Sequence, residues 1–209
     1  MMTYLAQRQE LCEYGHKLWS RGWVAANDGN LSMRLPDGNI LVTPTGVSKG
    51  DLTPEMLLVC DLEGRLLEEN SNYRPSSETK MHLCIYKARP DVGGVCHSHS
   101  PAATAFACAR KPIDDPILGE SIMQMGRCVP VSEYARTGTA ALPAAIEPLV
   151  KEGHSAILLA NHGAVTLEKD LKAAYWRMET LELTAQIHLN ARILGGGVPL
   201  TEEQVKELL

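Results

Sequence analysis

Apolar side chains recur with the spacing of an amphipathic helix in several separate parts of the chain. In residues 77–89, for example, Met81, Cys84 and Ile85 fall at helical spacing and would share one face, and Pro90 ends the pattern. Similar patterns and cap signals predict further helices. The predicted helices cover about residues 1–20, 77–89, 101–109, 139–152 and 171–194, with a short final one beginning at the capping-box sequence 201–204.

Shorter stretches alternate between apolar and polar residues or are apolar throughout, which is typical of strands. The predicted strands are residues 31–35, 40–42, 56–61, 65–69, 94–99, 128–132, 156–160 and 164–167. Tight turns such as PDGN at 36–39 and NHG at 161–163 join several of them in pairs, whereas 110–127 predicts no element. Hairpins mixed with helices predict an α/β layered fold with a central, mainly antiparallel sheet flanked by helices.

Length and composition indicate a soluble globular protein with one domain over residues 1–209. The 209 residues contain no internal repeat or convincing linker, and 44% of them are apolar and 22% charged. A net charge of −5 and an aromatic content of 5% argue against nucleic acid as a partner. An anionic substrate would therefore be held by local groups, such as backbone N–H donors or a metal.

The cysteines and the first residues bear on the compartment. Six cysteines are spread along the chain without a CxxC pair. The start is amphipathic and charged, and no stretch approaches the roughly 20 apolar residues needed to cross a bilayer. These features predict reduced thiols in a cytoplasmic protein that does not enter a membrane.

The sequence GVCHSHSPAA, residues 94–103, holds the first candidate chemistry. In an extended strand, residues two apart point to the same face, so His97 and His99 would stand side by side. They would then be able to share one ion with ligand bonds of about 2.0–2.1 Å. Two half-exposed histidines on an edge strand are the alternative, and the short pattern leaves both open.

His162 is the candidate for a third ligand. It lies in the NHG turn between two apolar strands, where a rigid scaffold commonly presents functional side chains. Three neutral nitrogen ligands with open coordination positions are the layout of a catalytic zinc site. His82 and His188 fit ordinary helical positions instead, and a turn histidine such as His162 is often simply exposed.

Glu78 is the candidate carboxylate. In the predicted helix it falls one turn before Met81, on or beside the buried face, where it would be able to move protons or touch a metal. A solvated first-turn glutamate favoured by the helix dipole is the alternative. Ser76 and Ser77, with the free N–H groups of the helix start, would make an anion cradle without lysines.

The order of the short motifs resembles one family. GN at 29–30, TPTG at 43–46, PSSE at 75–78, HSH at 97–99 and NHG at 161–163 together resemble the class II aldolase/adducin family over almost the whole chain. The resemblance implies a mainly antiparallel sheet between helical layers. It also implies a homotetramer with active sites at subunit interfaces.

The resemblance also implies roles for individual residues. His97, His99 and His162 would bind a divalent metal, zinc in the first place and manganese or cobalt as alternatives. Glu78 would be the acid/base carboxylate, which also ligates the metal when no substrate is bound. The phosphate of a sugar phosphate would be held by a set of small polar residues. These are Asn30, Thr45, Gly46, Ser76 and Ser77.

The activity that follows is cleavage of a ketose 1-phosphate, such as L-fuculose 1-phosphate, to dihydroxyacetone phosphate and a short aldehyde through a metal-stabilised enediolate. Two family tyrosines are missing here, one in the stretch 112–122, where Glu120 stands, and one in a C-terminal tail. Decarboxylation of a 3-oxo-tetronate 4-phosphate, and cleavage of a 5-deoxypentulose or methylthioribulose 1-phosphate, are therefore alternatives. A non-catalytic assembly domain like that of adducin is a further one, against which the complete histidine and glutamate set argues.

Overall fold

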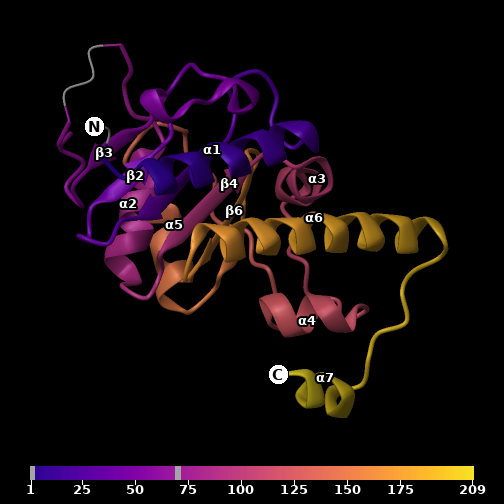
Figure 1. Ribbon diagram of the computed structural model, residues 1–209. Helices are drawn as coiled ribbons and strands as arrows, with labels where there is room; N and C mark the ends of the chain where they lie inside the picture. Colours follow the sequence, from indigo (N-terminus) through magenta and orange to yellow (C-terminus); the bar gives the residue numbers. More distant parts are fainter. Residues whose placement is uncertain (1–2, 69–71) are drawn as a thin grey trace.

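A six-stranded antiparallel sheet forms the centre of the computed structural model, which describes residues 3–68 and 72–209 (Figure 1). The strand order is β3-β2-β1-β4-β6-β5. The strands are β1 (Asn30–Arg34), β2 (Ile40–Val42), β3 (Leu58–Cys60), β4 (Gly94–Ser98), β5 (Ala156–Leu159) and β6 (Gly163–Glu168). All neighbouring strands run antiparallel, which confirms the predicted sheet and its flanking helices.

Helices cover both faces of the sheet and make two separate cores. The α-helices are α1 (Leu5–Ser20), α2 (Thr79–Ala88), α3 (Pro101–Ala109), α4 (Gly119–Met125), α5 (Ala141–Lys151), α6 (Leu171–Ile193) and α7 (Glu202–Leu208). Buried residues of α1, α3 and α6 pack on one face, and those of α2 and α5 pack on the other. Strand side chains alternate between the two cores: Val95 faces α2 and α5, whereas Cys96 faces the opposite helices.

Most predicted helices are confirmed, and side chains cap the first turn of two of them. The Asp170 side chain accepts a hydrogen bond from Ala173 N at 2.7 Å and begins α6. Thr201 and Gln204 form the predicted capping box of α7. These caps satisfy N–H groups that have no partner within a helix.

Three predictions need correction. Residues 128–132 form only isolated bridges, Ile113 with Val129 and Val131 with Leu158, because Pro130 has no N–H to continue a ladder. The second predicted hairpin shrinks to β3 and a single bridge between Cys60 and Leu66; its predicted end at residue 69 lies outside the described residues. The stretch 110–127, which predicted no element, contains α4.

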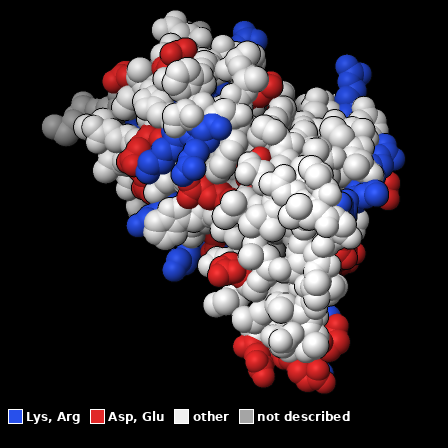
Figure 2. Space-filling view, turned by 90° about the vertical axis from the view of Figure 1, so that its right-hand side faces the viewer, with Lys and Arg blue, Asp and Glu red and all other residues white. Residues whose placement is uncertain are grey.

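The α4 and α7 helices lie on the far side of α6 from the sheet and form an arm (Figure 1). Arg127 and Glu202 join the two parts of this arm through an ion pair of 2.6 Å. Figure 2 shows a largely uncharged surface running down to a tip where acidic side chains gather. Nowhere in residues 3–68 and 72–209 is a helix both long and apolar enough to span a membrane.

Candidate active site

Sheet register brings the three candidate histidines to one place. His97 is in β4, and His99 follows its end directly. The turn between β5 and β6 carries His162, and Ser98 pairs with Ala164, so this turn lies beside the end of β4. The alternation along β4 directs His97 to the side of the sheet covered by α2.

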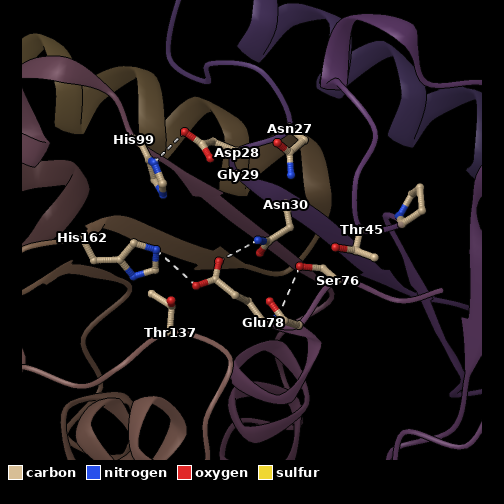
Figure 3. A pocket seen from close by; sticks show the side chains of 12 residues that line it. Asn27, Asp28, Gly29, Asn30, Thr45, Ser76, Glu78, His99, Thr137 and His162 are labelled. Atoms are coloured by element: carbon tan, nitrogen blue, oxygen red, sulfur yellow. Dashed lines mark hydrogen bonds and ion pairs between the residues drawn. The ribbon is translucent and has the colours of Figure 1, made fainter.

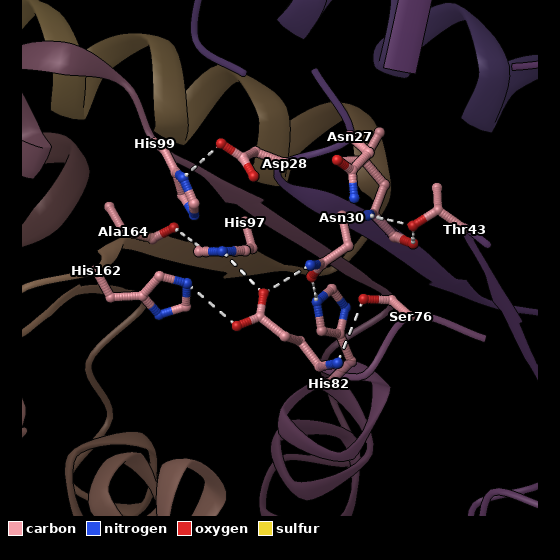
Figure 4. A network of polar contacts seen from close by, with 12 residues as sticks. Asn27, Asp28, Asn30, Thr43, Ser76, His82, His97, His99, His162 and Ala164 are labelled. Atoms are coloured by element: carbon pink, nitrogen blue, oxygen red, sulfur yellow. Dashed lines mark hydrogen bonds and ion pairs between the residues drawn. The ribbon is translucent and has the colours of Figure 1, made fainter. Parts of the chain in front are cut away.

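The three imidazole rings form a nearly equal-sided triangle (Figure 4). Their centroids are 5.1 Å apart for His97 and His99, 4.7 Å for His97 and His162, and 5.0 Å for His99 and His162. One nitrogen from each ring lies within 4.8 Å of the others. This geometry brings one ligand atom from each histidine to a position where a single metal ion would be shared.

Hydrogen bonds orient two of these rings. His97 Nδ1 lies 2.9 Å from the Ala164 carbonyl oxygen, which only accepts, so Nδ1 carries the proton and Nε2 is left as a lone pair. His99 Nδ1 lies 3.3 Å from Asp28 Oδ2. Such outer contacts commonly fix the orientation of metal-binding histidines.

Unpartnered ring atoms fit a metal at the centre of the triangle. Within the described residues, the buried His97 Nε2 and His99 Nε2 have no hydrogen-bond partner. Buried nitrogens of this kind ordinarily find a partner. A set of neutral imidazoles is the donor set that zinc and similar divalent ions use.

Glycine in the NHG turn makes room for the rings. A Cβ atom at Gly163 would lie 2.6 Å from the Ser98 carbonyl oxygen and 2.8 Å from the His99 ring. Asn161, with φ of 56°, adopts the left-handed conformation that asparagine tolerates better than most residues. The NHG sequence thus suits both the turn and the packing of the histidines against it.

Glu78 faces two of the histidines from the start of α2, and Figure 3 shows its carboxylate directed toward His162. Its carboxylate oxygens lie 3.1 Å from His97 Nε2 and 3.1 Å from His162 Nε2, and Asn30 Nδ2 donates to it at 2.8 Å. The side chain is buried, and not the solvated first-turn glutamate of the alternative interpretation.

The electrostatics of this cluster favour a positive charge at its centre. Burial raises the pKa of Glu78, but the adjacent His97 and His162 and the Asn30 hydrogen bond outweigh it and hold this pKa well below its ordinary value. Burial, together with His97, lowers the pKa of His162 to about 4. Although burial alone would lower it, Glu78 raises the pKa of His97. The carboxylate therefore faces a place that suits a proton on His97 or a cation.

A cavity of about 340 Å³ opens above these groups (Figure 3). We call the part with His97, His99, His162 and Glu78 the histidine end, and the part with Thr45, Gly46, Ser76 and Ser77 the serine end. Most of the predicted residues line the cavity, together with Asn27, Asp28, Gly29, Pro44 and Thr137. His97 lies fully buried beneath the surface, and Gly46 is next to the lining residue Thr45 without lining the cavity itself.

The serine end consists of loops. Thr45 N donates to the Arg74 carbonyl oxygen at 2.9 Å, and Ser76 N donates to that of Thr43 at 3.2 Å, so two chain segments run side by side there. Beneath them, Lys49 is almost fully buried, and its ammonium donates to Val47 O at 2.7 Å and Asn27 O at 3.0 Å. Lys49 therefore ties the loop before β1 to the loop after β2.

Residues that the sequence reasoning set aside or missed complete the surroundings. His82 is buried and contacts Asn30, which in turn contacts Glu78 (Figure 4). Its position four residues after Glu78, one helical turn away, was the available signal. Asp28 beside His99 and Thr137 at the cavity wall carried no distinguishing pattern. Glu120, the other uncertain carboxylate, is exposed on α4 and does not line the cavity.

Comparison with known proteins agrees with the motif pattern. The family model for the class II aldolase and adducin N-terminal domain matches residues 9–189. The 3-oxo-tetronate 4-phosphate decarboxylase of Haemophilus influenzae is 36% identical over 99% of this chain and 98% of its own. The 5-deoxy-D-ribulose 1-phosphate aldolase of Bacillus thuringiensis is 31% identical over 99% of this chain and 95% of its own.

A solved structure extends the likeness to three dimensions. An L-fuculose 1-phosphate aldolase superposes with a TM-score of 0.89 at 32% identity. The match covers 100% of this chain and 95% of that one. The similarity thus spans the sheet, both helical layers and the arm.

Proposed function

The chain belongs to the class II aldolase and adducin family, and we propose that it is a metal-dependent lyase acting on a sugar phosphate. Its reaction is cleavage of a ketose 1-phosphate resembling L-fuculose 1-phosphate, giving dihydroxyacetone phosphate and a short aldehyde. The observation that carries this proposal is the histidine end, where one nitrogen from each of three imidazoles lies within 4.8 Å of the others, beside a buried carboxylate at a cavity.

His97, His99 and His162 would hold a divalent metal, for which zinc is our first choice. Glu78 would be a further ligand in the absence of substrate, because its oxygens lie 3.1 Å from two of the histidines. When bound, the metal would polarise the substrate's ketone and stabilise negative charge on its oxygen as the neighbouring C–C bond breaks.

Glu78 would move the proton that the reaction requires. Cleavage leaves a three-carbon enediolate, and the carbon that has lost the aldehyde must then gain a proton; condensation runs the same step in reverse. A carboxylate aimed into the cavity and held by Asn30 is suited to that exchange. Fixing the acid/base group before substrate arrives is a large part of what such a site contributes.

The serine end would hold the phosphate. Thr45, Ser76 and Ser77 line the cavity with hydroxyl groups, and the start of α2 directs its helix dipole toward them. Gly46 and Asn30 complete the proposed set. Because the described lining contains no lysine or arginine, hydroxyls and backbone N–H groups would supply most of the direct contacts.

Decarboxylation is the second candidate, favoured by the 36% identity to 3-oxo-tetronate 4-phosphate decarboxylase over nearly the full length of both chains. Loss of carbon dioxide from such a substrate leaves the same three-carbon enediolate. Only the departing group differs, so the same residues would serve either reaction. Cleavage of a 5-deoxypentulose 1-phosphate is an aldol variant that the second relative favours.

The test is proton NMR of zinc-loaded protein with dihydroxyacetone phosphate in heavy water, with and without L-lactaldehyde. Deuterium entering the ketone phosphate is expected from either reaction. A new ketose phosphate would establish aldol chemistry. Exchange without condensation, together with carbon dioxide release from 3-oxo-tetronate 4-phosphate, would establish the decarboxylase. Protein that neither binds zinc nor catalyses exchange would contradict both and favour an assembly role.

We also propose that the protein is a cytoplasmic homotetramer with active sites between subunits. All six cysteines are free, as in proteins of reducing compartments. Large apolar side chains are exposed on and near the arm: Met123, Ile193, Leu194 and Val198. Such a patch is typical of a covered interface. Light scattering coupled to size-exclusion chromatography would reveal a mass four times that of one chain if this is correct.

A further inference from the structure

We propose that His82 is a positioning residue that sets the orientation of the Asn30 amide and, through it, holds Glu78. This inference deepens the proposed function and rests on it, because it assigns Glu78 the proton transfer. Nothing in the motif pattern or the comparisons assigns a role to His82.

A continuous chain of buried polar contacts leads from the core to Glu78. Tyr86 Oη lies 2.9 Å from Ser32 Oγ, which lies 2.6 Å from His82 Nδ1. His82 Nε2 lies 2.5 Å from Asn30 Oδ1, and Asn30 Nδ2 lies 2.8 Å from Glu78 Oε2. Figure 4 shows His82 and Asn30 lying between the strands and α2.

The chemistry of the groups permits one consistent direction of donation along this chain. The Glu78 carboxylate accepts, so Asn30 must present its NH₂ group to it and its carbonyl oxygen to His82. That oxygen accepts only, so His82 carries its proton on Nε2. His82 Nδ1 then accepts from the Ser32 hydroxyl, which in turn accepts from Tyr86. Every member has a partner, as a buried network requires.

Burial supports the neutral form that this direction requires. His82 is 2% exposed, and Ser32 and Tyr86 are equally shielded from water. An imidazolium there would lose its hydration, so burial favours the neutral ring. A neutral ring with Nε2 protonated has one donor and one acceptor, which matches its two neighbours.

The arrangement determines which face of Asn30 meets Glu78. If the amide turned over, its carbonyl oxygen would face the carboxylate, and two acceptors would repel each other. His82 prevents this because its Nε2–H needs an acceptor. Glu78 and His82 both belong to the start of α2, whereas Asn30 and Ser32 share one face of β1, so the chain also fixes the helix start against the sheet.

The test compares His82→Leu, which removes both ring nitrogens, with His82→Gln, which keeps a donor for Asn30. His188→Leu is the matched control, because His188 is an equally buried helical histidine that does not line the cavity. We expect His82→Leu to lower the deuterium exchange rate of dihydroxyacetone phosphate by about 10- to 100-fold, the usual range for residues that hold metal ligands in place. The KM and zinc content of His82→Leu should change little, and its melting temperature should fall no further than that of His188→Leu. His82→Gln should recover most of the rate.

A second measurement does not depend on activity. In ¹⁵N-labelled protein, the side-chain spectrum of His82 should show one proton, on Nε2, and remain unchanged between pH 6 and 9. Protonation on Nδ1 or on both nitrogens would overturn the proposal, as would an exchange rate in His82→Leu equal to that of the control. If the wild type shows this Nε2–H signature but no exchange with any candidate substrate, the proposed function fails while the contact chain stands.

Discussion

The two ends of the cavity both present polar side chains, but they differ in how firmly those side chains are held in place. At the histidine end, the side chains come from the end of a strand, a tight turn and the start of a helix, and His97 and Glu78 are buried. His97 and His99 each have a second group that holds them, Ala164 and Asp28. At the serine end, Thr45 and Ser77 are exposed and belong to loops.

This difference corresponds to what each end has to do. A small cation is held by atoms whose positions are set before it arrives, which requires a packed and hydrogen-bonded shell. A phosphate comes from solvent with its own water shell and needs an accessible cradle of donors. Changes at the histidine end should therefore act on metal content and on kcat, and changes at the serine end on KM.

His99→Ala should have the largest effect. Loss of one of three nitrogen ligands should lower zinc affinity by at least about 100-fold and abolish activity, while the fold is retained because His99 is only partly buried. Metal analysis, calorimetry and circular dichroism check this. His154→Ala, which removes a histidine from outside the cavity lining, is the control. Full zinc content in the His99 variant would exclude it from the site.

Glu78→Gln should separate metal binding from proton transfer within the histidine end. The three histidines remain, so some zinc should be kept, but the neutral amide cannot take up a proton. We expect the deuterium exchange rate to fall by about 10²- to 10⁴-fold, the usual contribution of a general acid/base group. An unchanged exchange rate would remove Glu78 from the mechanism.

Gly163→Ala tests whether the packing of the histidine end matters without changing a candidate ligand. The new Cβ would meet the Ser98 carbonyl oxygen and the His99 ring, so the turn or the rings must shift. Overpacking of this kind costs about 1–3 kcal/mol, which would lower the melting temperature by several degrees and weaken zinc binding. Gly119→Ala is the control, because φ is not positive there either and the new Cβ would meet only the Leu208 side chain at an ordinary 3.5 Å.

Ser77→Ala should have the smallest effect and a different kind of effect. Losing one hydrogen bond to a charged phosphate at an exposed position should raise KM by about tenfold with kcat nearly unchanged. Steady-state kinetics and inhibition by inorganic phosphate measure this. Ser20→Ala, at the end of α1, is the control. A loss of kcat without a change in KM would contradict the division between the two ends.

Periodicity predicted the parts of the fold that depend on local patterns. The helix α6 and the hairpin of β5 and β6 have long or clearly alternating apolar runs, and both are present as expected. Residues 128–132 also alternate, but Pro130 interrupts the ladder. The helix α4 was missed because its stability comes from contacts with α6 and α7, which no local pattern reports.

The candidate site could be assembled from the sequence only in part. Histidines spaced two apart and a turn histidine were visible, and the sheet register that joins them was not. His82 was assigned to an ordinary helical position because its significance depends on Asn30, which is 52 residues away. Asp28 was missed for a similar reason, because the conformation of its loop decides whether its carboxylate reaches His99.

Lys49, which is buried and joins two loops beside the cavity, should also make the stability of the fold depend on pH in the alkaline range. Burial lowers the pKa of Lys49 from an ordinary value of 10.5 to about 8, although Asp28 opposes the shift. Between these two values the unfolded chain binds more protons than the folded one, so the free energy of unfolding contributed by Lys49 rises with pH. Below pH 8 the lysine is charged in both states, and the cost of burying that charge is present in full. As the pH increases from 8 to 10, the melting temperature of the wild type should therefore rise relative to that of Lys49→Met. A constant difference between the two melting temperatures over this range would show that the ammonium is not desolvated.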